Sequence, residues 1–217
     1  MRSVIIILLA SLAWWPARGA GLGSNGLAEA RGQASNSLVT FQALITPTNY
    51  KLMGFNTFDQ IQSATNGEPI PIYTITLTRL RNYGGQEMNE LLQETPRAIV
   101  PVLVGATVHS STTVRRDPQA WTTANWGQPR LIRDIMAAYN AIPTNTIPAG
   151  QRPFVVEMPV FNRWFVGYTN TMNKLILRTT SGLDFGPATN VLKSHVVTTN
   201  AMSALSAKAV AFTGQSN

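Results

Sequence analysis

The stretch Ala98-Ile-Val-Pro-Val-Leu-Val-Gly105 decides the fold class of this chain. Its seven largely apolar residues have the length and composition of a buried strand, and its final glycine supplies the positive φ that a tight hairpin needs. The chain returns through β-branched residues from Thr107 to Arg115 and turns again at Arg116-Asp117-Pro118-Gln119. A third strand follows from Trp121 to Trp126. The sequence therefore predicts a three-stranded antiparallel meander over residues 98–126.

Further helices and strands are expected on both sides of this meander. Pro129 opens a helix whose apolar stripe contains Leu131, Ile132, Ile135, Met136 and Tyr139. Strand-like segments are expected at residues 70–80, 154–158, 161–168 and 174–179, with short helices within 37–63 and 87–94 and a terminal helix over 191–212. This order predicts an α+β fold, in which helices pack mainly on one face of an antiparallel sheet.

The first nineteen residues have the pattern of a secretory signal peptide. Arg2 precedes an apolar run from Val4 to Trp15, and Ala17-Arg18-Gly19 supplies small residues for cleavage after Gly19. The run of about 12 residues is shorter than the roughly 20 that span a membrane. An uncleaved anchor, with Trp14 and Trp15 at the membrane interface, is the alternative.

The composition after residue 19 predicts a leader segment followed by a single domain. Residues 20–36 are rich in glycine, alanine, serine and asparagine, which is typical of a flexible leader. Residues 37–217 then form a single α+β domain, which is a common domain length. No later apolar stretch is long enough to span a membrane, so we expect no transmembrane segment after signal cleavage.

Composition also restricts location and partners. The chain has no cysteine, which excludes disulfides, thiolate metal sites and a cysteine nucleophile, and fits the periplasm or exterior of a bacterium. The net charge is +7, but the basic residues are scattered. A nucleic-acid interface concentrates them on one surface, so there is no specific nucleic-acid signal. Affinity for an anionic envelope polymer or for lipid headgroups remains open.

Catalytic patterns are sparse. The two histidines, His109 and His195, have no metal-ligand spacing, and no P-loop, dinucleotide or Ca²⁺ motif implies a cofactor or metal. A serine hydrolase would combine His109 with Ser110 or Ser111 and an acid such as Asp117, but the GxSxG elbow is absent. Glu87, Glu90 and Glu94 have helical spacing, which fits either a cation or acid/base site or simply a solvated helix surface.

Aromatic and basic residues predict a binding surface instead. Trp121 and Trp126 are an odd number of residues apart, so on a regular strand they point to opposite faces, one buried and one exposed. Arg163 and Trp164 lie in another aromatic strand region, and an exposed ring beside an arginine is suited to stacking on a ligand. We expect the site on the sheet face away from the helices, around Trp121 or Trp126, Arg115 and Trp164.

These observations lead to three functional hypotheses. The first is an exported, non-catalytic binding or accessory module of the bacterial envelope, whose partner is an envelope protein or an anionic polymer. The second is a hydrolase that acts on an envelope polymer through carboxylates or His109. The third is a structural subunit of an envelope assembly.

Overall fold

The computed structural model describes residues 22–180, 196–197 and 199–211. Its strands form one sheet in the order β5-β4-β3-β2-β6-β7-β8-β9, and β1 pairs separately with β3. The strands are β1 (Ala64–Asn66), β2 (Ile70–Thr74), β3 (Gln93–Val104), β4 (Thr107–Arg116), β5 (Trp121–Gly127), β6 (Phe154–Met158), β7 (Arg163–Thr169), β8 (Leu175–Thr179) and β9 (Val196–Val197). Every described pair is antiparallel except the parallel pair β2–β6.

The predicted meander is confirmed as β3, β4 and β5. Val100 lies opposite Thr112, and Thr112 lies opposite Trp126, so the three strands pair side by side across the apolar stretch of β3. Gly105 takes the positive φ of +60° in the first hairpin. The predicted α+β class is confirmed as well, with four α-helices among the described residues: α1 (Ser24–Leu44), α2 (Leu77–Arg81), α3 (Pro129–Asn140) and α4 (Thr199–Ala211).

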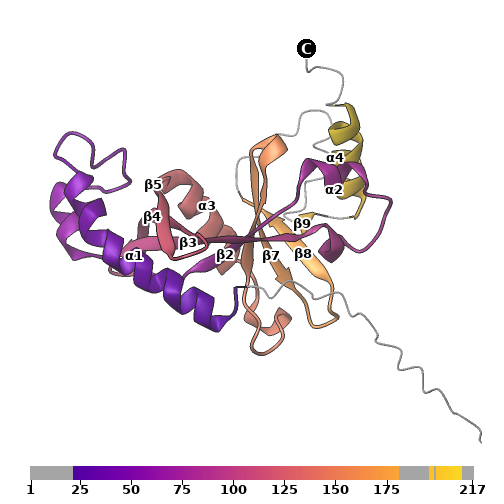
Figure 1. Ribbon diagram of the computed structural model, residues 1–217, viewed down its shortest axis with the longest axis horizontal. Helices are drawn as coiled ribbons and strands as arrows, with labels where there is room; N and C mark the ends of the chain where they lie inside the picture. The colour runs from indigo at the N-terminus through magenta and orange to yellow at the C-terminus, as the bar shows by residue number, and fades with distance from the viewer. Residues whose placement is uncertain (1–21, 181–195, 198, 212–217) are drawn as a thin grey trace, which may run out of the picture.

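Alternation along the strands divides the core between two sheet faces. Ala98 and Val100 of β3 pack with α1, whereas Ile99 packs with α3. The strand register continues the face that carries Ala98 of β3 to Tyr73 of β2 and to Val156 of β6. At that end, residues of α2 and α4 cover this face. We call this face the α1 face and the opposite one the α3 face. Three of the four helices thus cover the α1 face, as predicted, at its two ends (Figure 1).

The α1 face also carries the main correction to the sequence prediction. Residues 20–36 were expected to be a flexible leader, but α1 begins at Ser24. Ala30 and Ala34 are fully buried against the meander. The small residues that are typical of linkers here recur at helical spacing, which lets the helix approach the sheet closely. The predicted signal peptide, together with Ala20 and Gly21, lies outside the described residues.

The boundaries of three other predicted elements differ from those in the structure. The strand predicted over 70–80 ends at Thr74, because Thr76 caps α2 by accepting a hydrogen bond from the Arg79 backbone at 3.3 Å. The helix predicted over 87–94 shrinks to the 3-10 turn η2 (Met88–Leu91), since β3 already begins at Gln93. The terminal helix begins at Thr199, after β9. Its predicted start at Val191 lies outside the described residues.

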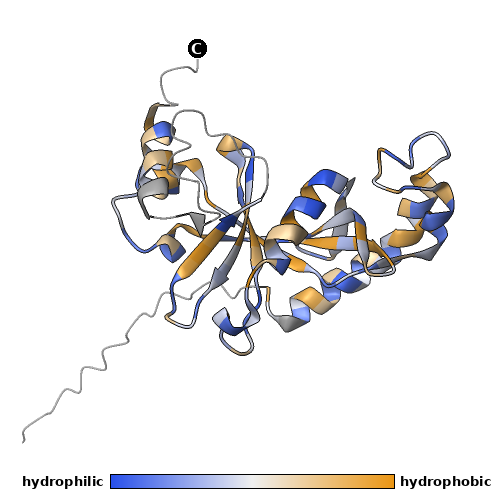
Figure 2. Ribbon diagram, turned by 180° about the vertical axis from the view of Figure 1, so that it is seen from behind, coloured by the Kyte–Doolittle hydropathy of each residue, from blue (hydrophilic) through white to orange (hydrophobic). Residues whose placement is uncertain are grey.

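Three further 3-10 turns complete the description: η1 (Phe58–Ser63), η3 (Thr144–Thr146) and η4 (Pro159–Phe161). Hydropathy coloured on the ribbon shows stretches of apolar residues along the strands and a mixture of polar and apolar residues along the helices (Figure 2). Among the described residues, no helix combines the length and the apolar character that crossing a membrane requires.

Candidate functional site

The two tryptophans of β5 lie on the same face, so the prediction that they point apart was wrong. Asn125 pairs with Thr113 but Thr123 pairs with Val114, which leaves one extra residue in β5. This β-bulge reverses the alternation between Trp121 and Trp126. Both rings are half-buried in clusters that include residues of α1.

The two indole N–H groups differ in their partners. The Trp121 Nε1 donates to the Glu29 carboxylate of α1 at 3.0 Å. The Trp126 Nε1 is buried and has no hydrogen-bond partner in the structure. The Trp121 indole therefore holds α1 against the edge strand, and both tryptophan rings are half-buried against α1 where the sequence suggested an open binding surface.

The remaining residues of that predicted surface lie elsewhere. Trp164 is half-buried in the cluster beneath α3. Arg115 is exposed and bonds Asp117 at 2.8 Å, and its register opposite Arg97 places it on the α3 face. Arg163 begins β7 opposite Met158. The structure thus divides the predicted ligand-binding set between the two faces of the sheet.

His109 makes structural contacts. Its Nδ1 lies 3.1 Å from the Gly54 carbonyl oxygen, and its ring stacks on Phe55 with centroids 5.4 Å apart. Gly54 has a φ of +97°, and a Cβ there would lie 2.0 Å from the His109 carbonyl oxygen. His109 and Gly54 therefore lock the loop after α1 onto β4.

The other candidates for a hydrolytic triad are not assembled around His109. Ser111 donates to the Gly127 carbonyl at 2.6 Å, whereas the buried Ser110 hydroxyl has no partner in the structure. Asp117 lies eight residues further along, about 26 Å for an extended strand. Hydrogen bonds from Thr122 and Arg115 lower the pKa of its carboxyl. His195 lies outside the described residues.

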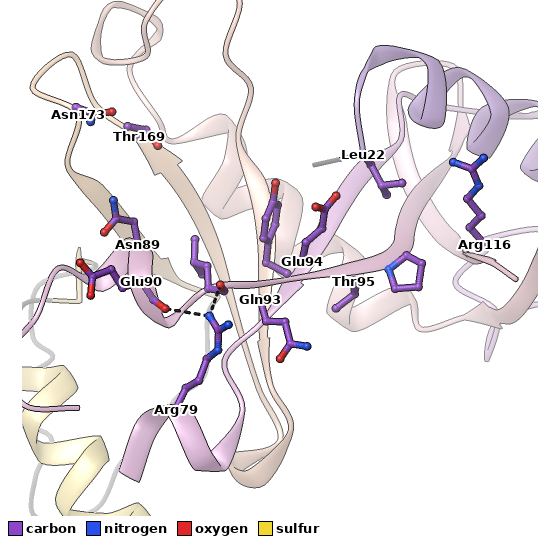
Figure 3. A pocket seen from close by; sticks show the side chains of 13 residues that line it. Leu22, Arg79, Asn89, Glu90, Gln93, Glu94, Thr95, Arg116, Thr169 and Asn173 are labelled. Carbon is purple, nitrogen blue, oxygen red and sulfur yellow. Dashed lines mark hydrogen bonds between the residues drawn. The ribbon is translucent and has the colours of Figure 1, made fainter. Parts of the chain in front are cut away.

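A cleft lies instead over the middle of the α1 face. Because α1 covers the meander while α2 and α4 cover β6 to β8, parts of β2 and β3 are left open between them. The hollow measures about 1090 Å³. Leu22 and Arg116 lie at one side of it, Glu94 lies near the middle, and Asn89, Glu90, Thr169 and Asn173 lie at the other side (Figure 3).

The walls of this cleft are fixed by backbone contacts. The Arg79 guanidinium of α2 donates to the carbonyl oxygens of Glu90 at 2.9 Å and Leu92 at 2.6 Å, and so holds η2 in place (Figure 3). The Thr95 hydroxyl donates to the Ile72 carbonyl oxygen, which ties β3 to β2. The polar groups of the cleft are therefore presented by a preformed framework.

Glu94 and Tyr73 form the centre of the cleft floor, where they lie opposite each other on β3 and β2. Partial burial raises the pKa of the Glu94 carboxyl, although a hydrogen bond from the Leu22 backbone N–H acts in the other direction. Burial and the nearby Glu94 charge both raise the pKa of the Tyr73 hydroxyl. The centre of the cleft thus has a carboxyl group beside a phenol.

A second hollow of about 550 Å³ adjoins the first and shares Leu22 and Tyr73 with it. Its rim carries Glu68, which bonds Arg31 at 2.7 Å and lies 3.9 Å from Arg152. Phe154 lines this hollow, and its ring centroid lies 4.7 Å from that of Tyr73. Two aromatic rings therefore mark the junction of the two hollows.

Most of this site was not predicted from the sequence. The spacing of Glu87, Glu90 and Glu94 predicted one helix face; of these, Glu90 and Glu94 line one cleft, but from η2 and β3. Tyr73 and Phe154 are 81 positions apart and meet only through the parallel pairing of β2 with β6. Among the described residues, no cluster of histidine and acidic side chains is suited to hold a metal ion.

No protein family, no curated protein and no solved structure matches this chain.

Proposed function

We propose that this chain is an exported, non-catalytic binding module of the bacterial envelope, and that its ligand occupies the cleft at Tyr73 and Glu94. The observation that carries the proposal is the convergence of polar side chains from several separate segments, among them β2, η2, β3 and the end of β7, over an uncovered part of the sheet. Concave sites with a few positioned polar groups are typical of ligand binding.

The dimensions of the cleft favour an extended ligand. Ligand pockets for small molecules measure roughly 300–1,000 Å³. The main hollow of about 1090 Å³ already reaches that limit, and the hollow of about 550 Å³ adds to it. A polymer that runs across Leu22 and Tyr73 would contact both hollows at once.

Export is supported by the first nineteen residues and by the absence of cysteine. Expression of the full chain with a C-terminal tag, followed by fractionation, tests this part. The tagged product is expected outside the cytoplasm, with an N-terminus at Ala20. Full-length product in the cytoplasm contradicts export.

Co-sedimentation of residues 20–217 with purified cell envelopes tests the site. Tyr73→Ala and Glu94→Gln are expected to weaken binding at least tenfold. The matched controls Phe58→Ala and Glu87→Gln, which change exposed side chains outside the cleft, are expected to bind like the unmodified chain. Equal binding by all variants contradicts the site. Release of soluble envelope fragments that Glu94→Gln abolishes contradicts the non-catalytic assignment.

A further inference from the structure

We infer that the ligand of this cleft is a chain of uncharged sugar rings, one of which stacks on the Tyr73–Phe154 pair while its neighbours extend into the two hollows. This inference rests on the proposed function, since it specifies the ligand of the same site. It is drawn from the aromatic junction, from the charges around it and from the shape of the sheet beneath it.

The aromatic pair is positioned by a glycine. Gly167 of β7 lies opposite Phe154 of β6. A Cβ at position 167 would lie 2.5 Å from the Phe154 ring. Because Gly167 has no side chain, the Phe154 ring can pack against the sheet beside Tyr73. The two ring planes are inclined by 53°. Gly167 is a positioning residue for this platform.

The platform suits a sugar ring for an electrostatic reason. The face of an aromatic ring carries partial negative charge, and the C–H bonds on one side of a sugar ring carry partial positive charge. Tyr73 and Phe154 are each only half-buried, so they keep surface for such a contact. The phenol, and the nearby carboxylate of Glu94 opposite Tyr73, provide partners for the hydroxyls around the ring edge.

The surrounding charges favour a neutral chain over an anionic one. Glu90 and Glu94 line the main hollow together with Arg79 and Arg116, so the formal charges of this hollow balance and give a polyanion no net attraction. In the second hollow, Glu68 is already partnered by Arg31 and lies near Arg152. The amides of Asn89 and Asn173 both donate and accept hydrogen bonds, as sugar hydroxyls do.

The sheet geometry disfavours an extended peptide. Peptides commonly bind by adding a strand to a sheet edge, where unpaired backbone groups are available. This cleft lies over a sheet face, and β2, which carries Tyr73, is paired with β3 on one side and with β6 on the other. The pairing of β3 with β4 begins at Arg97, so only the short stretch 93–96 of β3 has an edge without a described strand partner beside the cleft. A peptide seated on the Tyr73–Phe154 pair would therefore have side-chain contacts only.

The test uses residues 20–217 and calorimetric titration with N-acetylglucosamine and glucose oligomers. A hexamer of one of them is expected to bind at least tenfold more tightly than the dimer, because only the longer chain reaches both hollows. Tyr73→Ala and Phe154→Ala are expected to weaken hexamer binding at least tenfold. Gly167→Ala is expected to weaken it about threefold, through displacement of the Phe154 ring.

Two variants separate a loss of the platform from a loss of the fold. Tyr73→Phe keeps the ring and is expected to bind within about threefold of the unmodified chain. Phe58→Ala changes an exposed ring on η1 and is expected to bind unchanged. Thermal melting of every variant checks that the protein is folded during the titration.

The outcomes also separate this inference from the proposed function. Tyr73-dependent binding of polyphosphate or of an unstructured decapeptide, without binding of either sugar hexamer, overturns the sugar assignment and leaves the cleft as the site. Hexamer binding that survives Tyr73→Ala and Phe154→Ala in the folded variants overturns the platform. Envelope binding that is independent of Tyr73 and Glu94 overturns the proposed site itself.

Discussion

The two ends of the α1 face are covered by helices that pack in different ways. At the meander end, α1 buries small residues, Ala30 and Ala34, against strands that include Thr112. At the other end, α4 buries Met202 and Leu205 in a cluster of large apolar side chains with Phe165. One sheet face therefore has a close, partly polar contact at one end and a broad, apolar contact at the other.

The difference shows what each helix contributes. Apolar area stabilises in proportion to the surface buried, so Met202 and Leu205 of α4 are expected to stabilise the fold more, residue for residue, than Ala30 and Ala34 of α1. At the α1 end, the hydroxyls of Ser110 and Thr112 and the indole N–H of Trp126 are buried without partners in the structure, which is unfavourable. The α1 helix buries Phe41 near its other end, and it also positions the cleft, because its first turn follows Leu22 at the edge of the cleft.

The largest expected change in the free energy of unfolding comes from the apolar cluster beneath α4. Phe165→Ala removes a fully buried ring and is expected to lower the free energy of unfolding by about 3–5 kcal/mol. Urea denaturation measures this loss. Phe58→Ala, at a 37 % exposed ring, is the control and is expected to lose much less. Similar losses for both variants would remove the contrast between core and surface phenylalanines.

The next effect concerns the closeness of the α1 contact. Ala34→Leu places a large side chain where α1 touches the meander, and is expected to lower the free energy of unfolding by about 1–3 kcal/mol. Ala43→Leu, on an exposed position of the same helix, is the control. An Ala34→Leu variant as stable as the unmodified chain would show that α1 has room to move away from the sheet.

The polar groups buried beneath α1 can be tested separately. Substitutions at two neighbouring residues of β4 are expected to change the free energy of unfolding in opposite directions. Thr112→Val removes a buried hydroxyl without a partner and is expected to raise the free energy of unfolding by about 1 kcal/mol. Ser111→Ala removes a hydrogen bond to Gly127 and is expected to lower it by about 1 kcal/mol. Urea midpoints compare the two, and a loss of stability in Thr112→Val would contradict the polar mismatch.

The smallest effect concerns pH and the cleft. Because the pKa of Glu94 is raised in the folded state, the folded chain retains a proton that the unfolded chain has already lost. Stability therefore falls as pH rises from the ordinary value of 4.5 through the higher folded value. Glu94→Gln is expected to flatten this slope, which denaturation between pH 4 and pH 7 measures. An unchanged slope in Glu94→Gln would assign the pH dependence to another group.

The parts of the fold that the sequence predicts are those fixed by local chemistry. Apolar strands and a turn glycine identify the meander, and Pro129 with its apolar stripe identifies α3. The bulge in β5 changes the direction of Trp126 through one extra residue, and no local signal marks it. Likewise, the linker-like composition of α1 gives no local sign of the sheet against which Ala30 and Ala34 are buried.

The cleft was less predictable because it depends on contacts between distant segments. Glu90 and Glu94 could be singled out by their spacing, but not the surface that they share with Thr169 and Asn173. The role of Gly167 depends on its register opposite Phe154, which a single strand pattern does not contain. Pairing between strands that are distant in the sequence thus creates the cleft, whereas local sequence patterns predict only the individual helices and strands.

The parallel pairing of β2 with β6 has a consequence for how this chain reaches its folded state. The meander and α3 are continuous in sequence and join neighbouring segments, so they are expected to form early on the folding pathway. Thr74 and Glu157, by contrast, are 83 residues apart when they bond, so their loop must close later. The folding nucleus is therefore expected in the meander, and the cleft is completed only when this late, long-range step brings Phe154 beside Tyr73.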